Sequence, residues 1–267
     1  MYDKKRYLAI PVIAIVLHLF LSNILYFSVE KLFLNVFHIT ENQFMKYSYL
    51  GEILIYIVII IIFFAFYKFL WRKEESESRT EINSKDVAFS LIAGLGVSGI
   101  SFVWIMMAEQ IPALQKSIEA MNTGSKNIAG GNAFGTFMIA VVCAPIIEEL
   151  LFRGIVFQSI RKVGPAWIAI LISSVLFGAY HLNIVQATYA TLMGIVAAII
   201  YEKKKNLAFP IFVHFANNFV AMVQSFSPQK IDGIINIFSV IMMIPLGYII
   251  YRLLKDKRAE TENIQQF

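Results

Sequence analysis

The segment APIIEELLFRGIVF, residues 144–157, places two adjacent carboxylates, Glu148 and Glu149, and the guanidinium of Arg153 inside an otherwise apolar stretch from 133 to 160. A spanning helix needs about 20 mostly apolar residues, so this stretch is long enough to cross a bilayer. An ionisable side chain in hydrocarbon costs roughly 2.5–3.5 kcal/mol even on the more lenient insertion scale. We therefore expect an all-α fold of membrane helices in which these charged residues serve a function.

The composition of the whole chain is that of a polytopic membrane protein. Of its 267 residues, 58% are hydrophobic and 15% are charged, whereas soluble domains average about 45–50% apolar and about 25% charged residues. The net charge of +5 comes from residues between the apolar stretches, and no basic segment carries the interleaved aromatic residues of a nucleic-acid groove. We expect membrane lipids as surroundings and no nucleic-acid partner. The single cysteine, Cys143, is interpreted as a packing residue.

Eight apolar stretches are candidates for membrane helices. They lie at about 7–29, 50–70, 87–107, 133–160, 165–182, 184–201, 206–224 and 233–254. Lys and Arg accumulate in the cytosolic loops of membrane proteins. With the N-terminus in the cytosol, eight crossings place 17 Lys and Arg residues in cytosolic segments and 5 in outer segments. The sequence therefore predicts about eight transmembrane helices, with both termini on the cytosolic side of the cell membrane.

These stretches are interpreted as one membrane domain covering residues 1–267. Its expected parts are peripheral helices one to three with an outer loop (1–132), catalytic helices four to seven (133–224), a last helix (233–254) and a polar tail (255–267). The first stretch follows basic residues, as a signal peptide does, but it is too long for an h-region and has no small-residue cleavage site. We interpret it as a retained helix. For an amphipathic stretch at 111–121 two alternatives are open: a segment along the outer membrane surface and a plain loop.

Two further motifs place imidazole and amide groups in later apolar stretches. One pairs Phe177 with His181, and the other pairs His214 with Asn218. Both pairs are four residues apart, as are Glu149 and Arg153, so each pair lies on one helical face. Asn217 is interpreted as packing or support for this site.

Helix geometry predicts that the three motifs meet at one membrane depth. Counted from the turn at Gly164 and at 1.5 Å per residue, Glu148 and His181 both lie roughly 25 Å along adjacent antiparallel helices. Because the fourth stretch is longer than the bilayer core, its end is expected to protrude by roughly 10 Å. His214, counted from Lys205, reaches a similar depth of roughly 14 Å. We therefore expect an active site within the bilayer and nearer to the cytosol.

Taken together and in this order, Glu-Glu-x-x-x-Arg, Phe-x-x-x-His and His-x-x-x-Asn resemble the motifs of the CAAX protease and bacteriocin-processing (CPBP) family. These intramembrane endopeptidases are also called the Abi family or the Rce1-like type II CAAX endopeptidases. The resemblance covers about residues 133–224. It implies a peptide hydrolase of the glutamic type that requires no cofactor.

The resemblance also implies roles for individual residues. Glu148 would be the general base that activates a water molecule, and His181 would bind and orient that water. His214 and Asn218 would stabilise the oxyanion of the tetrahedral intermediate. The supporting residues would be Glu149, Arg153 and Phe177.

The substrate is expected to be a membrane-associated peptide or membrane-protein precursor. The Ile-, Lys-, Phe- and Asn-rich composition is typical of low-GC Gram-positive bacteria, in which prenylated CAAX proteins are not expected. A bacteriocin or signalling-peptide leader is therefore favoured over a CAAX-like C-terminus. The sequence gives no indication of the oligomeric state.

Three alternatives compete with this interpretation. Zinc is a candidate cofactor, with Glu149, His181 and His214 as ligands, although the sequence has no His-Glu-x-x-His motif. A non-enzymatic immunity or scaffold protein is a second alternative, and it would tolerate loss of the first carboxylate. A transporter is the third alternative, and it would be expected to contain broken helices and inverted repeats. No repeat is found, and we interpret Pro145 and Pro210 as kinks that open the cavity.

Overall fold

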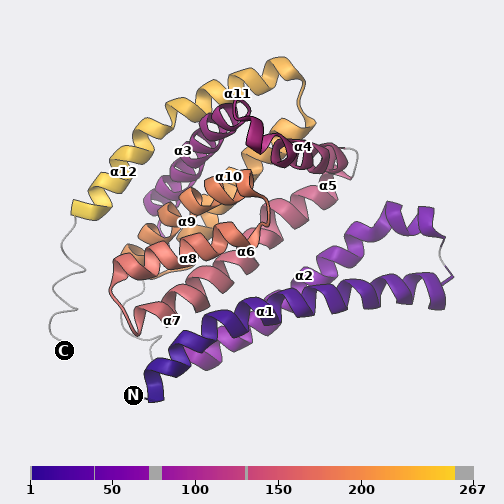
Figure 1. The fold of residues 1–267 in the computed structure, drawn as a ribbon, viewed down its shortest axis with the longest axis horizontal. Helices are drawn as coiled ribbons and strands as arrows, with labels where there is room; N and C mark the ends of the chain where they lie inside the picture. The colour runs from indigo at the N-terminus through magenta and orange to yellow at the C-terminus, as the bar shows by residue number, and fades with distance from the viewer. Residues whose placement is uncertain (1, 39, 72–79, 130–131, 256–267) are drawn as a thin grey trace.

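The structure is a computed structural model that describes residues 2–38, 40–71, 80–129 and 132–255. Over these residues the chain consists of helices and connecting turns, with no strand among them (Figure 1). The all-α fold class is therefore confirmed.

The helices occupy the apolar stretches, and a shorter amphipathic helix lies between them. In chain order the elements are α1 (Tyr2–Lys31), η1 (Leu32–Val36), α2 (Glu41–Trp71), α3 (Ser84–Ala108), η2 (Pro112–Leu114), α4 (Gln115–Ala129), α5 (Ala133–Thr136), η3 (Phe137–Cys143), α6 (Ala144–Glu149), η4 (Leu150–Phe157), α7 (Gln158–Arg161), α8 (Ala166–Tyr180), α9 (Ile184–Lys204), α10 (Ala208–Phe226), α11 (Gln229–Ile241) and α12 (Met243–Lys255). The segments from α5 to α7 follow one another without a break and coincide with the predicted fourth stretch.

Five helical segments of the described chain are long and apolar enough to cross a membrane. They are Lys4–Val36, Tyr47–Trp71, Ser84–Ala108, Ile184–Lys204 and Gln229–Lys255. Helix α8 is also apolar, but its 15 residues span roughly 22 Å, which is less than a hydrocarbon core of about 30 Å. The protein is thus a multi-pass membrane protein. The count of eight crossings and the cytosolic side of the termini stay predictions.

The helices divide into a peripheral pair and a central group. In Figure 1, α1 and α2 run side by side along one edge of the molecule, and α11 and α12 lie toward another edge. Large apolar side chains of the pair are exposed, including Phe20 and Phe69 at 59% and 72%, as lipid-facing helices require. Helix α3, predicted as one of the peripheral helices, packs against α9, α10, α11 and α12 and lies inside the bundle.

Small residues let the central helices approach closely. A Cβ atom added at Gly94 of α3 would lie 2.2 Å from the carbonyl oxygen of Val213 in α10. One added at Gly178 of α8 would lie 2.4 Å from the carbonyl oxygen of Ala187 in α9. Contacts of this kind are the usual basis of helix association in membranes. They hold α8, which carries Phe177, against α9, and α10, which carries His214 and Asn218, against α3.

The two prolines of the motif regions act differently from each other. Pro145 lies in the first turn of α6, directly after the π-helical segment η3. Because proline lacks an N–H group and crowds the carbonyl four residues earlier, the preceding turns widen. Pro210 is the third residue of α10, where backbone N–H groups have no helical partner to lose. The prediction that Pro210 kinks a helix was therefore wrong.

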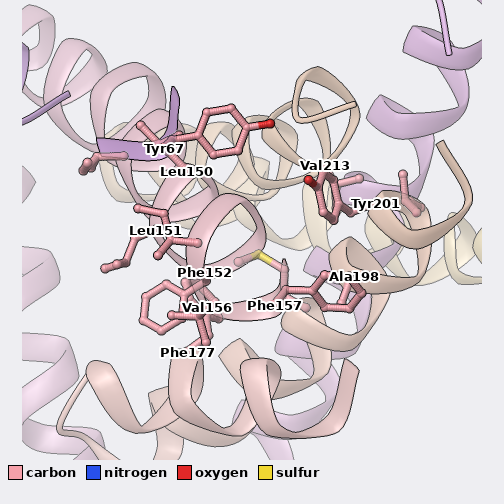
Figure 2. Close-up of a cluster of buried hydrophobic side chains, with 14 of the residues drawn as sticks. Tyr67, Leu150, Leu151, Phe152, Val156, Phe157, Phe177, Ala198, Tyr201 and Val213 are labelled. Carbon is pink, nitrogen blue, oxygen red and sulfur yellow. The ribbon is translucent and has the colours of Figure 1, made fainter. Parts of the chain in front are cut away.

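The densest part of the core surrounds the segment that follows the two carboxylates. All eight residues of η4 are buried, and they are π-helical. Figure 2 shows Phe152 and Phe177 close together, and their rings meet edge to face at 5.1 Å. Trp71 at the end of α2 donates from Nε1 to the Gly154 carbonyl oxygen at 2.8 Å. This segment is therefore held on several sides, which fixes the charged residues beside it.

Candidate active site

A fully buried ion pair forms the base of the site. Glu149, the last residue of α6, accepts a hydrogen bond at Oε1 from Nη1 of Arg153 at 2.9 Å, and both side chains have 0% exposure. The i, i+4 spacing predicted this pairing. The second guanidinium nitrogen, Nη2, donates to the carbonyl oxygen of Gly194 in α9 at 2.9 Å. A Cβ atom at Gly194 would lie 3.1 Å from Nη2, so the absent side chain leaves room for the guanidinium.

His214 of α10 is joined to the same carboxylate. Its Nδ1 lies 3.0 Å from Oε1 of Glu149, and the side chain is almost fully buried. Because an ionised carboxylate only accepts, we assign the proton of this bond to Nδ1. The other ring nitrogen, Nε2, lies 3.8 Å from Oε2 of Glu148. This separation is too long for a direct hydrogen bond, but it places a nitrogen beside the first carboxylate.

Glu148 differs from Glu149 in exposure and in partners. Its side chain is 15% exposed, whereas that of Glu149 is completely covered. Its Oε2 is buried and has no hydrogen-bond partner among the described residues. Tyr56 of α2 and Tyr180 of α8 lie close enough for the carboxylate to act on their hydroxyl groups electrostatically. The site thus holds a partly exposed carboxylate whose buried Oε2 has no hydrogen-bond partner in the part of the chain that the structure describes.

Phe177 of α8 is the point at which the three motifs meet. Its ring lies 4.8 Å from the guanidinium carbon of Arg153. The same ring meets the imidazole of His181 at 5.0 Å and that of His214 at 5.6 Å, both edge to face. The predicted meeting of the three motifs is therefore confirmed. The aromatic ring was expected beside one imidazole and contacts two.

His181 follows the last residue of α8 and is half-buried. Its Nδ1 lies 3.0 Å from the carbonyl oxygen of Phe177, so that carbonyl accepts from Nδ1–H. Nε2 is then the nitrogen that remains for another partner. The next residue, Leu182, has a φ of 56° and is 92% exposed. A leucine in the left-handed region is strained, and such strain is common next to functional groups.

Asn218 is placed differently from the carboxylates and imidazoles. Its Nδ2 donates to the Ala140 carbonyl oxygen in η3 at 2.8 Å, and its Oδ1 accepts from Nδ2 of Asn217 at 3.1 Å. Oδ1 of Asn217 in turn accepts from Ser98 of α3 at 3.3 Å. Within the described residues these bonds run to the neighbouring helices and not to the carboxylates. Among the described residues, the second N–H of the Asn218 amide has no acceptor. Asn217 contacts Asn218 through its amide.

The ligand set expected for zinc is not assembled. Oε1 of Glu149 already accepts from Arg153 and His214, and the ring of Phe177 contacts the imidazoles of both His181 and His214. In the part of the chain that the structure describes, no group of three His, Cys, Asp or Glu side chains is arranged to hold a metal ion. These residues therefore do not fit the zinc alternative. Cys143 is buried, in keeping with its predicted packing role.

One polar pair next to the site was missed from the sequence. His18 of α1 is 5% exposed, and its Nδ1 lies 2.9 Å from the hydroxyl oxygen of Tyr180, the residue before His181. The His18 ring also meets those of Tyr180 and Phe63 at 5.7 and 5.4 Å. His18 is the only histidine or charged residue in the first apolar stretch, 7–29. An ionisable side chain inside an apolar membrane stretch is costly and is therefore a functional candidate, and this argument applies to His18 as it does to the other motifs.

The fold and the site together define a helical membrane protein with a carboxylate–histidine cluster in its interior. Residues 130–220 match the family described as type II CAAX prenyl endopeptidase Rce1-like, so the resemblance inferred from the three motifs is confirmed for this segment. The chain is also 32% identical over 93 residues to a Bacillus subtilis protein named "Putative membrane peptidase YdiL". This alignment covers 35% of the chain and 38% of that relative. No solved structure matches the chain significantly.

Proposed function

We propose that the protein is an intramembrane endopeptidase that hydrolyses a peptide bond with a water molecule activated by Glu148. The observation that carries this proposal is the state of the Glu148 carboxylate. It is partly accessible, its Oε2 has no partner among the described residues, and the imidazole of His214 lies beside it at 3.8 Å. A general base must be within reach of the proton that it removes, directly or through one water molecule.

In this proposal each residue has a distinct role in the hydrolysis of the peptide bond. Glu148 takes a proton from water, whose oxygen attacks the carbonyl carbon of the scissile bond. The protonated carboxyl group then gives the proton to the leaving amine as the C–N bond breaks. His181, whose Nδ1 is held by a backbone carbonyl, presents Nε2 to the water. His214 Nε2 and the unused N–H of Asn218 act on the developing oxyanion.

The buried ion pair is proposed to position the catalytic groups. Glu149 binds Nδ1 of His214, so it sets the orientation of the imidazole and stabilises its positive form. Arg153 keeps Glu149 ionised and ties it to α9 through the Gly194 carbonyl. Donors fixed in advance are most effective where water is scarce, because the low dielectric strengthens their interaction with a developing charge.

We further propose that the reaction needs no resident metal ion. The glutamate that would serve as a ligand already shares Oε1 with Arg153 and His214. Cleavage by the purified protein should therefore be unaffected by 1,10-phenanthroline at concentrations that strip zinc from proteins. Loss of cleavage with the chelator, restored by added zinc, would reinstate the metal alternative.

The proposed substrate is a peptide precursor in or on the membrane, such as the leader of a bacteriocin or signalling peptide. A CAAX-like C-terminus is the other candidate, favoured by the description of the matching family. We place the protein in the cytoplasmic membrane of a bacterium, with access to the site from the cytosol. The cytosolic access rests on the topology predicted from the distribution of Lys and Arg, and the bacterial assignment rests on the composition.

The test compares membrane and secreted peptides by mass spectrometry in a deletion strain that carries one of three variants at equal protein level. These are the wild type, Glu148→Gln, and Glu119→Gln as a control. Glu119 lies exposed on α4, so the control makes the same change outside the site. Peptides cleaved with the wild type and Glu119→Gln but not with Glu148→Gln are the expected result. If Glu148→Gln restores the same peptides, the non-enzymatic scaffold or immunity alternative replaces this proposal.

A further inference from the structure

A second polar site lies at the end of the bundle where α3 begins and α9 and α12 end. A cavity of about 280 Å³ opens there between the three helices, lined by Asp86, Lys204, Arg252, two hydroxyl-bearing side chains and apolar side chains. No residue of the candidate active site lines it. Neither the match to residues 130–220 nor the proposed reaction accounts for this cavity, because two of its three walls lie outside the matched segment.

The acidic group of the cavity is already paired. One oxygen of Asp86 lies 2.7 Å from Nζ of Lys204, and the other accepts from Nδ2 of Asn83 at 2.8 Å. Asn83 is also the N-cap of α3 and accepts from the Asp86 backbone N–H. The Asp86 carboxylate therefore has a partner at each oxygen and is neutralised by Lys204.

Among the described residues that line the cavity, Arg252 is the cation that has no acidic partner. Its Nη1 donates to the hydroxyl oxygen of Tyr248 at 3.1 Å, one turn earlier on α12. Among the residues that the structure describes, no carboxylate lies within ion-pairing distance of its guanidinium. The cavity lining therefore carries one net positive charge. The N-terminus of α3 adds the positive end of a helix dipole at the same place.

Apart from the hydroxyl groups of Ser90 and Tyr248, the rest of the lining is apolar, and it lies where a lipid would present its headgroup. Phe89, Ile249 and Leu253 form walls beside the cations. The same end of the bundle carries Lys203 and Lys204, a feature that predicts the cytosolic membrane boundary. Basic pockets between helices on the cytosolic side recognise the phosphate of anionic lipids. A volume near the lower limit of small-molecule pockets suits a headgroup whose acyl chains remain in the bilayer.

We propose that this cavity binds one anionic phospholipid. The guanidinium of Arg252 binds the phosphate, because its planar fork can donate two N–H groups to two phosphate oxygens. Lys204, paired with Asp86, lines the same cavity, and an acyl chain lies against Ile249 and Leu253. The site is independent of Glu148, so failure of the proposed peptidase activity leaves this inference untouched.

The test measures binding of dioctanoyl phosphatidylglycerol to the purified full chain in a non-ionic detergent by native mass spectrometry. The key variant is Arg252→Gln, and the matched control is Lys255→Gln. Lys255 lies on the same helix end and donates to Tyr251 at 3.3 Å, as Arg252 does to Tyr248, but it does not line the cavity. We expect Arg252→Gln to weaken binding about tenfold and Lys255→Gln to leave it unchanged.

Further measurements distinguish binding of an anionic lipid from binding of a neutral lipid or of free phosphate. Arg252→Lys, which keeps the charge, should retain part of the affinity if the fold is intact. Dioctanoyl phosphatidylcholine should bind more weakly than the anionic lipid, and inorganic phosphate should not displace it. Equal losses in Arg252→Gln and Lys255→Gln would reduce the effect to surface charge and overturn the proposal. Displacement by inorganic phosphate alone would overturn it in favour of a free-anion site.

Discussion

Glu149 holds His214 through a hydrogen bond of 3.0 Å between Oε1 and Nδ1, across 65 residues of sequence. The same oxygen accepts from Arg153 at 2.9 Å, so a single atom joins two helices and two sequence motifs. Because Nδ1 is occupied, Nε2 is the nitrogen that lies next to Glu148. The two adjacent carboxylates therefore have different surroundings, and their removal should have different consequences.

Glu149→Gln should destabilise the protein, and Glu148→Gln should not. The first change leaves the fully buried guanidinium of Arg153 without its counter-charge, and breaking a buried pair in this way costs about 3–5 kcal/mol. The second change neutralises a carboxylate whose buried Oε2 has no partner among the described residues. The stability of the Glu148→Gln variant should equal or exceed that of the wild type. The free energy of unfolding in detergent, measured for both variants, checks this prediction.

Both variants should lose cleavage, so stability is the readout that separates a base from a supporting residue. An equally large loss of stability in Glu148→Gln would contradict the view that this carboxylate is unpartnered. The exposed change Glu119→Gln serves again as the control and should alter neither quantity.

Arg153→Lys should lower cleavage at least about tenfold although it keeps the charge. A lysine ammonium on a flexible stem cannot bind Glu149 and the Gly194 carbonyl in the fixed fork of a guanidinium. We also expect a loss of stability of about 1–3 kcal/mol, because the buried Gly194 carbonyl loses its donor. Cleavage rates and unfolding free energies of the purified variant provide the measurement.

The matched control for this change is Arg161→Lys. Arg161 likewise contacts a carboxylate and a glycine carbonyl, those of Glu202 and Gly164, but its side chain is 24% exposed. Because this pair is partly open to solvent, it contributes less than a fully buried pair, so this variant should lose less cleavage and stability than Arg153→Lys. Equal effects at the two positions would show that the fork geometry at Arg153 is not special.

Much of the site could be predicted from the sequence, because charged groups in apolar stretches are few and helix periodicity is regular. The spacing of Glu149 and Arg153 predicted their ion pair, and counting along the helices brought Phe177, His181 and His214 together. These inferences need only the rise per residue and the cost of burying a charge. They do not depend on how the helices pack.

What depends on packing could not be predicted. The π-helical turns of η3 and η4 arise where a proline and tight neighbours outweigh the α-helical preference. The position of α3 inside the bundle follows from the close approach of its glycines to α10, α11 and α12, which the sequence shows only as small residues. The partner of Asn218, the Ala140 carbonyl, likewise belongs to a distorted turn that no periodicity indicates.

The hydrogen bond between His18 and Tyr180 should be measurable as a coupling. In a double-mutant cycle of His18→Leu and Tyr180→Phe, we expect a coupling energy of about 0.5–1.5 kcal/mol in the free energy of unfolding. Pairing His18→Leu with Tyr26→Phe, whose ring is exposed on the same helix, should give none. A coupling of zero for Tyr180 would mean that its hydroxyl makes no net contribution through His18.

The packing of α8 on α9 should control both stability and cleavage, because α8 carries Phe177 and His181. Gly178→Ala places a methyl group 2.1 Å from Oγ1 of Thr191 and 2.4 Å from the Ala187 carbonyl oxygen, so the two helices must separate. Overpacking of this kind typically costs about 1–3 kcal/mol. Separation also moves α9, and with it the Gly194 carbonyl that holds Arg153. Cleavage should therefore fall together with stability.

Gly247→Ala makes the same change on α12 where nothing lies within 4 Å of the new methyl group. Replacing a helical glycine there should be neutral or should stabilise the protein by roughly 0.5–1 kcal/mol, since alanine loses less backbone entropy on folding. Thermal unfolding and peptide cleavage should be measured for both variants side by side. If Gly178→Ala unfolds and cleaves like Gly247→Ala, the two helices are not in the close contact that places Phe177 and His181 in the site.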